Sequence, residues 1–590
     1  MKIFISILFL FVSNKVDQNK VDKDKVEYYH PTYQDYKFWT EEKNSKETFI
    51  EKNFSIKKYY SHNFFKHDNI GFFFRYRKIL SIPNRYKQLN QENFNANMPK
   101  NMLFFKDPFF YREKIKYFDV KTPISEIFYI SDFFKKKKIL GGFFSQNFNK
   151  KINYSIEYRN FYLENEFDLK ESKNLLLTTF NYQDKDDYNY KLWGHYINQK
   201  FEIEDKKITP KWNIKNYKNV FLSHKEFFQN RFYISLIQKI SSFKEKNRSF
   251  LLKTYMEYEK YSNQNLQKQK INHSYLRNSF FLIFNHKKMN IEIGSIFDKI
   301  NYQLFNNNHK KDKEINSFSI QTKVFYPINN IFEFYSNGKW IIENYKKSYL
   351  KTNIMLNVFL LPKFLFLTQL SINENNNLIP IFIMNKNKDC YNSHEEKNIF
   401  FFEKEKTINF SLSSHEKKYY ISFYISRLNH FLRHEEKKIK EFLYPKHIQL
   451  YGFNIKTTHD LWRFQFNNIL LYQKYNSNPL IFSVPNFILR STIFYQDYFF
   501  HKALFVKTGF SFHYFNEFYS KKVYYPFNFQ TFSFDKECIP NKIGGRPFLD
   551  YFFNFKIYKT IFYFNIQNIG FYDNENKFFI KIGFLWNLFT

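Results

Sequence analysis

The feature that most constrains the fold is an alternation of apolar and polar residues that recurs from about residue 116 to the C-terminus. In the last stretch, Lys577–Thr590, apolar side chains occupy every second position from Ile580 to Leu588, while Lys581 and Asn587 lie on the other face. A period of two is the signature of a β-strand with one apolar and one polar surface. Because the pattern recurs about twenty times, it predicts an all-β chain that forms a transmembrane antiparallel up-and-down β-barrel.

The alternation assigns the side chains of each strand to lipid or to the barrel interior. Within 461–475, Trp462 and Phe464 alternate with Arg463 and Gln465. A charge that faces lipid at mid-bilayer costs about 2–4 kcal/mol, so the charged face is expected to line the lumen. A soluble all-β protein with a dry core would explain any single strand. It fits poorly with so many strands that carry aromatic residues on one face and basic residues on the other. The residues expected to face lipid are Tyr154, Tyr158, Trp462, Phe464, Phe562, Phe564, Phe584 and Trp586, and those expected to line the pore are Arg159, Arg463, Gln465, Arg490, Lys507 and Lys581.

The topology of known barrels constrains the number of strands in this chain. A single-chain bacterial barrel has an even number of strands, both ends on the periplasmic side, short periplasmic turns and long external loops. Counting back from the C-terminus agrees with counting forward if 200–229 is one long external loop and Tyr217–Leu222 is not a strand. The expected number is then about 22 strands, with about 16–20 as the alternative if strand pairs are misassigned. The short turns used in the count are Asn149–Lys151, Asp184–Asp187, Lys287–Asn290, Ile328–Asn330, Pro362-Lys363, His415–Lys418, Thr457–Asp460, His501-Lys502 and Lys559-Thr560.

The chain before the barrel falls into two parts. Residues 1–13 carry a lysine followed by a short apolar run, which is too short for a membrane helix and suits a secretory signal peptide. Residues 14–115 are polar and irregular, and Gly71 is their one glycine. We expect this segment in the periplasm or at the barrel mouth; a compact plug domain is less favoured, because glycine supplies tight turns. The barrel itself is expected over residues 116–590.

The charge of the chain constrains its partners. The net charge is +36, and the sequence holds 81 Phe and 47 Tyr. The enriched residue types have AT-rich codons, so their placement matters more than their number. Lysines gather between strands, as in Lys135–Lys138 and Lys310–Lys313, and no recognition helix or RNA-binding aromatic motif accompanies them. No nucleic-acid partner is expected, whereas a basic exterior suits contact with anionic lipid headgroups of the outer membrane.

No arrangement of residues predicts an enzyme, a cofactor or a metal site. Three His-Glu pairs begin at His394, His415 and His434. The topology places the first and third outside the cell and the second in a periplasmic turn, so they cannot share one metal ion. No nucleophile elbow or phosphate-binding glycine loop is found. The two cysteines, Cys390 and Cys538, lie in expected loops, and two residues cannot establish a disulfide.

Local sequence motifs point to a known family. Five stretches resemble, in the expected order, strands and hairpins of one family: Tyr117–Ile124, Glu126–Tyr129, Lys502–Gly509, Gly544–Pro547 and Gly583–Phe589. The family is the "Putative porin" family of Bacteroidota. The resemblance implies an outer-membrane barrel that the barrel-assembly machinery inserts into the bilayer. The chain departs from the usual pattern of such barrels because it ends on Thr590 rather than on an aromatic residue.

A barrel in the outer membrane leaves two kinds of function open. The first is a porin that allows passive diffusion of small hydrophilic solutes. The second is a receptor-type or energised-uptake barrel, or a structural outer-membrane protein, because about 22 strands enclose a lumen that known barrels usually plug. Long loops at 200–229, 374–398 and 516–546 would narrow an open pore. The basic pore residues predict a mild anion preference, unless carboxylates such as Glu157 balance them.

Overall fold

The computed structural model of the 590-residue chain describes most of the sequence from residue 112 onward and four short stretches before it. No helix among the described residues is long and apolar enough to cross a membrane. The described residues are 35–41, 48–49, 72–75, 78–81, 112–132, 136–164, 170–184, 189–207, 221–243, 248–265, 269–306, 309–343, 347–360, 364–377, 399–414, 416, 418–434, 447–476, 485–519, 523–524, 529–530, 542–569 and 579–588.

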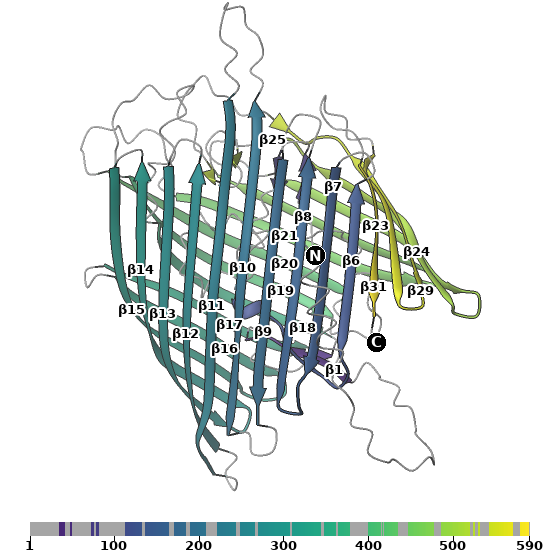
Figure 1. Ribbon diagram of the computed structural model, residues 1–590. Helices are drawn as coiled ribbons and strands as arrows, with labels where there is room; N and C mark the ends of the chain where they lie inside the picture. Colours follow the sequence, from purple (N-terminus) through teal and green to yellow (C-terminus); the bar gives the residue numbers. More distant parts are fainter. Residues whose placement is uncertain are drawn as a thin grey trace, which may run out of the picture.

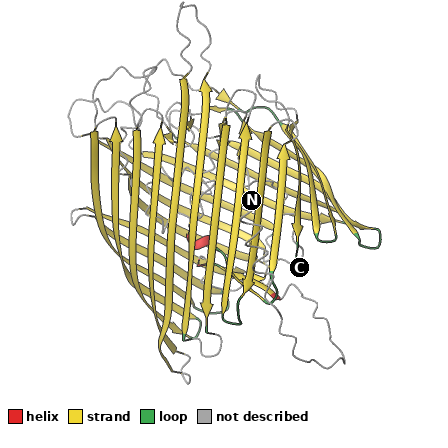
Figure 2. Ribbon diagram, viewed as in Figure 1, coloured by secondary structure: helices red, strands yellow, loops and turns green. Residues whose placement is uncertain are grey.

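The chain forms a closed barrel of 22 antiparallel strands, as the sequence predicted (Figures 1 and 2). Neighbours in the barrel follow one another in sequence, and the last strand pairs with the first to close the cylinder. The barrel strands are β6 (Ile124–Asp132), β7 (Lys136–Asn147), β8 (Ile152–Glu164), β9 (Lys170–Gln183), β10 (Tyr190–Lys207), β11 (Phe221–Phe243), β12 (Arg248–Asn265), β13 (Gln269–His286), β14 (Met289–Asn306), β15 (His309–Pro327), β16 (Phe332–Glu343), β17 (Lys347–Leu360), β18 (Phe364–Asn377), β19 (Ile399–Ser414), β20 (Tyr419–His434), β21 (His447–Leu461), β22 (Phe464–Tyr475), β23 (Phe487–Phe499), β24 (Leu504–Phe515), β29 (Phe548–Ile557), β30 (Thr560–Ile569) and β31 (Phe579–Asn587).

The strands differ widely in length. β31 has 9 residues and β11 has 23, whereas about 9–11 residues are enough to cross a bilayer. The strands around β11 are therefore longer than a bilayer crossing requires (Figure 1). The expected external loop at 200–229 is wrong in its bounds, because β10 continues to Lys207 and pairs there with the start of β11 at Phe221. Polar residues interrupt the alternation in this region, and pairing outside the bilayer does not require an apolar face.

One further turn differs from the expected topology. The turn between β21 and β22 consists of Trp462 and Arg463, whereas the sequence placed it at Thr457–Asp460. The latter residues continue β21, in register with the start of β22. Trp462 has a φ of 54°, a left-handed conformation that most residues other than glycine avoid. Residue types that favour turns are absent at 462–463, so composition gave no signal for this turn.

Burial alternates along the strands with the period of two that the sequence shows. In β20, Ile421, Phe423 and Ile425 are 50%, 44% and 48% exposed, whereas Ser422 and Tyr424 between them are buried. Residues opposite each other in an antiparallel pair point to the same side of a sheet. A rung is here a row of directly opposed side chains, one from each neighbouring strand. One rung of buried side chains runs from β8 to β14: Ser155, Thr179, His195, Tyr233, Glu257, Arg277 and Asp298.

The closing seam of the barrel requires a glycine. Gly583 of β31 lies opposite Ile130 of β6. A Cβ atom at Gly583 would lie 2.4 Å from the carbonyl oxygen of Tyr129, which is a backbone atom that cannot move aside. The glycine at this position therefore allows the last strand to approach the first closely enough to pair.

A small three-stranded sheet precedes the barrel in sequence. It consists of β2 (Thr48–Phe49), β1 (Tyr36–Trp39) and β5 (Tyr117–Val120), in that order. The short helix η3 (Arg112–Lys114) leads into β5 and lies within the outline of the barrel (Figure 2). The barrel ladder itself begins at Ile124, so β5 lies before it although the sequence assigned the barrel to residues 116–590.

Candidate channel lumen

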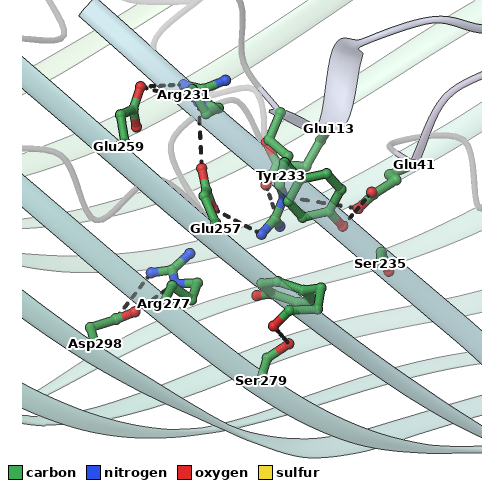
Figure 3. A network of polar contacts seen from close by, with 12 residues as sticks. Glu41, Glu113, Arg231, Tyr233, Ser235, Glu257, Glu259, Arg277, Ser279 and Asp298 are labelled. Atoms are coloured by element: carbon green, nitrogen blue, oxygen red, sulfur yellow. Dashed lines mark hydrogen bonds and ion pairs between the residues drawn. The ribbon is translucent and has the colours of Figure 1, made fainter. Parts of the chain in front are cut away.

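The inner wall of β11–β14 carries a ladder of buried charges of alternating sign (Figure 3). Arg231 of β11 forms ion pairs with Glu259 at 2.9 Å and with Glu257 at 3.5 Å, both on β12. Arg277 of β13 forms an ion pair with Asp298 of β14, with 2.6 Å between Nε and Oδ1. The pairs Arg231–Glu259 and Arg277–Asp298 are each directly opposed across adjacent strands, so strand register fixes their geometry.

Part of the chain before the barrel packs against this ladder. We name the described residues Asp35–Glu41 and Arg112–Val120 the luminal segment. Arg112 donates a hydrogen bond of 3.2 Å to the Glu257 carboxylate and one of 2.7 Å to Glu113. Its guanidinium group lies 4.4 Å from the centre of the Tyr255 ring, a cation–π distance. One arginine thereby joins the segment to the wall through both charge and aromatic contact.

The Glu41 carboxylate forms a second polar attachment. It accepts hydrogen bonds of 2.6 Å from Nε1 of Trp193 on β10 and from the hydroxyl of Tyr233 on β11. The side chains of Arg112 and Glu41 are only 7% and 6% exposed. Both attachments therefore depend on a charged side chain that is buried away from water. A buried charge is stable only when polar partners surround it.

The β1–β5 sheet adds aromatic and amide contacts to the same wall. Trp39 stacks on Tyr117 with 4.6 Å between ring centres and meets Trp193 edge-on at 5.3 Å. The Tyr117 hydroxyl lies 2.8 Å from Nδ1 of His195. The amide nitrogen of Asn181 on β9 donates a 2.9 Å hydrogen bond to the carbonyl oxygen of Phe118. The segment thus rests on the inner face of the barrel from β7 to β12.

The pKa values of two titratable groups in the luminal segment shift in opposite directions. Burial alone would raise the pKa of the Glu113 carboxyl, but the adjacent Arg112 guanidinium and a backbone hydrogen bond lower that pKa below its ordinary value. Burial, together with the nearby Glu41 carboxylate, raises the pKa of the Tyr117 phenol well above its ordinary value. At neutral pH the segment therefore presents a carboxylate at Glu113 and a neutral hydroxyl at Tyr117.

The opposite wall carries an apolar patch at the end of β21–β24 that bears the long connection from β24 to β29. Phe515 and Phe548 flank the long connection from β24 to β29, and both are buried. Phe518, three residues into that connection, packs edge-on against Phe515 at 6.0 Å. The connection returns where the Gly545 amide donates a 2.8 Å hydrogen bond to the Phe515 carbonyl. Both described ends of the expected loop 516–546 thus lie against this patch, whose other members are Tyr424, Leu450, Leu471 and Ile488.

The residues expected to line the pore are spread around the barrel and do not converge. Lys507 and Lys581 are buried, and the Lys507 amine lies 3.7 Å from the centre of the Phe494 ring. Arg159 forms an ion pair with Glu157, and Arg490 is half-buried on β23. Arg463 lies in the β21–β22 turn and pairs with Asp497 at 2.5 Å, while Gln465 at the start of β22 donates a hydrogen bond to Asp460. Their role in a pore stays a prediction.

The residues expected to face lipid occupy similarly scattered positions. Trp462 is 78% exposed in its turn, and Trp586 is 47% exposed. Phe464 is exposed, and the remaining five are half-buried: Tyr154, Tyr158, Phe562, Phe564 and Phe584. Contact with lipid also stays a prediction for this set.

Sequence reasoning missed the residues that form the polar network on β11–β14 and the luminal segment. Glu257, Glu259 and Arg277 lie at the polar positions of strands in which apolar and polar residues alternate. This alternation could have identified them as residues of the barrel interior. Glu41 and Arg112 belong to the irregular segment, where no periodicity marks a face. No cluster able to hold a metal ion is found among the described residues. Several expectations concern residues outside the described part of the chain: the expected signal peptide at 1–13, both cysteines (Cys390 and Cys538), and His394 and His415.

Comparison with known sequences identifies one family model, described as "Putative porin", which matches residues 32–326 and 204–590. No curated protein gives a significant match. The first matched range includes the luminal segment as well as the first barrel strands. The likeness to this model therefore extends over the barrel and over the chain that enters it.

Comparison with solved structures finds barrels of similar architecture. The siderophore receptor PirA from Acinetobacter baumannii has 8% identity and a TM-score of 0.57, with 81% of this chain and 82% of that chain covered. The ferric enterobactin receptor PfeA from Pseudomonas aeruginosa has 8% identity and a TM-score of 0.56, with 81% and 83% covered. PirA from Pseudomonas aeruginosa has 8% identity and a TM-score of 0.52, with 81% and 83% covered. At such low identity the likeness concerns the fold alone.

Proposed function

We propose, since the chain belongs to the "Putative porin" family, that it forms an outer-membrane channel through which small hydrophilic solutes diffuse passively. The protein is an outer-membrane β-barrel. The observation that carries the proposal is the polar inner surface of the closed cylinder, where serine, threonine, glutamate and arginine side chains follow one another along the rungs. Polar linings of this kind hold water in porin lumens.

The proposal includes the expected processing and partners. Residues 1–13 would direct the chain to the outer membrane as a signal peptide, and 14–115 would supply the part that enters the barrel. The barrel-assembly machinery would insert residues 116–590 into the bilayer. A mild preference for anions would follow if cations such as Lys507 outweigh luminal carboxylates such as Glu257.

The proposal can be tested by measuring how fast small sugars enter lipid vesicles that contain the refolded protein. We expect vesicles loaded with a large polymer to swell in isotonic solutions of small sugars, and the swelling rate to fall as the sugar becomes larger. A size-dependent, non-saturating rate is the behaviour of a passive pore. Vesicles that contain folded protein but admit no sugar, including the smallest, would contradict a diffusion channel.

One observation favours a second candidate, a receptor-type barrel for energised uptake. The luminal segment occupies part of the interior, and the solved barrels of similar fold include siderophore and ferric enterobactin receptors. This candidate predicts no swelling with sugars and tight, saturable binding of one solute at the external face. Titration with ferric siderophores, followed by calorimetry, separates the two candidates.

A further inference from the structure

The luminal segment is structurally separable from the barrel. Among the described residues, β1 and β5 form their own small sheet and share no hydrogen-bond ladder with the barrel, which closes through β31 and β6. The segment's backbone instead meets the wall through side chains. Asn181 donates to the Phe118 carbonyl, and the Val120 amide donates to the Asn147 side chain at 3.3 Å. The segment can therefore leave the wall without breaking the strand pairing that holds the cylinder together.

The Arg112–Glu257 ion pair is arranged so that each of its two charges keeps a counter-ion when they part. On the wall, Glu257 retains Arg231 at 3.5 Å after Arg112 leaves. On the segment, Arg112 retains Glu113 at 2.7 Å. Breaking a buried ion pair is usually costly because one charge is left alone in the interior. Here neither partner is left alone, so release costs less than it does for an isolated buried pair.

The remaining contacts favour the docked state at rest. Tyr117 and Trp193 are fully buried, and Trp39 is 2% exposed between them. Lys191 of β10 adds a cation–π contact, with its amine 3.6 Å from the centre of the Trp39 ring. Undocking would return these large rings to water, which is unfavourable in proportion to their apolar area. The geometry thus describes a segment that is held by default and can still be released.

We propose that the luminal segment is a movable constriction of the channel, fastened to β10–β12 by Arg112 and Glu41, and that its release widens the pore. The inference rests on the proposed function, because a constriction has meaning only in a channel. Arg112 and Glu41 lie outside the barrel strands, so their contacts hold the segment against the wall and do not hold the barrel together. The inference therefore assigns them a role in gating. Weakening either attachment should shift the population towards the released, wider state.

Single-channel recording of the full-length protein in planar bilayers tests the proposal. Arg112→Gln removes the charge that meets Glu257, and Glu41→Gln weakens the attachment to Trp193 and Tyr233. We expect each variant to spend about tenfold or more time than the unmodified protein in its largest conductance level, since a change of about 1.4 kcal/mol in the docking equilibrium corresponds to a factor of ten. Arg248→Gln is the matched control, because Arg248 is an exposed arginine at the first position of β12, and Glu257, which meets Arg112, lies nine positions later on that strand.

The outcomes separate this inference from the proposed function. Longer or more frequent large openings in both variants, with Arg248→Gln unchanged, support the movable constriction. Stepwise currents that are identical in all four proteins overturn the constriction and leave the porin proposal standing. Silence in all four, with each protein showing the gel mobility shift of a folded barrel, overturns the channel and the constriction together.

Discussion

Replacing Arg277 with methionine is expected to lower the free energy of unfolding by about 3–5 kcal/mol, because the change removes the arginine that balances the buried Asp298 carboxylate. The Arg277 side chain is 2% exposed and that of Asp298 is fully buried. Two hydrogen bonds join them, at 2.6 Å from Nε to Oδ1 and 3.0 Å from Nη2 to Oδ2. Glu257, which lies opposite Arg277 across β12 and β13, would also lose a neighbouring cation. Urea unfolding of the protein refolded in lipid vesicles measures the loss.

A matched control distinguishes the cost of breaking a buried ion pair from the cost of breaking a more exposed one. Arg159→Met breaks the pair with Glu157, whose side chains are 20% and 16% exposed. Water reaches this pair more than it reaches Arg277 and Asp298 and weakens the attraction between its charges, so this variant should lose less stability than Arg277→Met. The double variant Arg277→Met with Asp298→Asn should lose less unfolding free energy than Arg277→Met alone, since it also removes the carboxylate charge that Arg277 balances. Equal losses for Arg159→Met and Arg277→Met would contradict the buried ladder.

Arginine in place of Phe510 is expected to cost about 2–4 kcal/mol of unfolding free energy, which is the penalty for a cation facing lipid at mid-bilayer. Phe510 lies near the middle of β24, is 55% exposed, and packs beside Tyr551 with ring centres 5.1 Å apart. The same vesicle-based unfolding experiment measures the change, and the loss should appear without any change in strand content.

The control for this substitution is Tyr558→Arg. Tyr558 is 84% exposed in the β29–β30 turn, where an arginine would remain in water. The cost there should be about 0–1 kcal/mol, as for arginine near the membrane interface. A penalty at Tyr558 as large as that at Phe510 would mean that the two exposed faces share one environment, contrary to a bilayer around β24.

The barrel could be predicted from the sequence because its signal is local and repeated. Alternation over residues such as Ile580 to Leu588 identifies a strand without knowledge of its partner. Strand number follows, since an even count and short periplasmic turns constrain the total. Exact bounds do not follow, as the extension of β10 to Lys207 and the turn at Trp462 show. Outside the bilayer neither face must be apolar, so the pattern no longer reports where a strand ends.

The luminal network could not be predicted in the same way. Glu41 meets Tyr233 across 192 residues of sequence, and Arg112 meets Glu257 across 145. Such contacts depend on closure of the whole cylinder, and an irregular segment carries no periodicity that indicates a docking face. The charges of β11–β14 were visible as polar positions, but their pairing required the register between strands.

Accessibility to lipid along a single strand tests the central claim most directly. Single cysteines at positions 421 to 426 of β20, placed in a protein whose Cys390 and Cys538 are replaced by serine, can carry a fluorescent label. Quenchers attached to lipid chains should quench labels at Ile421, Phe423 and Ile425 strongly and labels at Ser422, Tyr424 and Ser426 weakly. That alternation is the result expected of a wall between hydrocarbon and a polar interior. Quenching that is uniform along the six positions, or that repeats every three to four residues, would contradict the barrel.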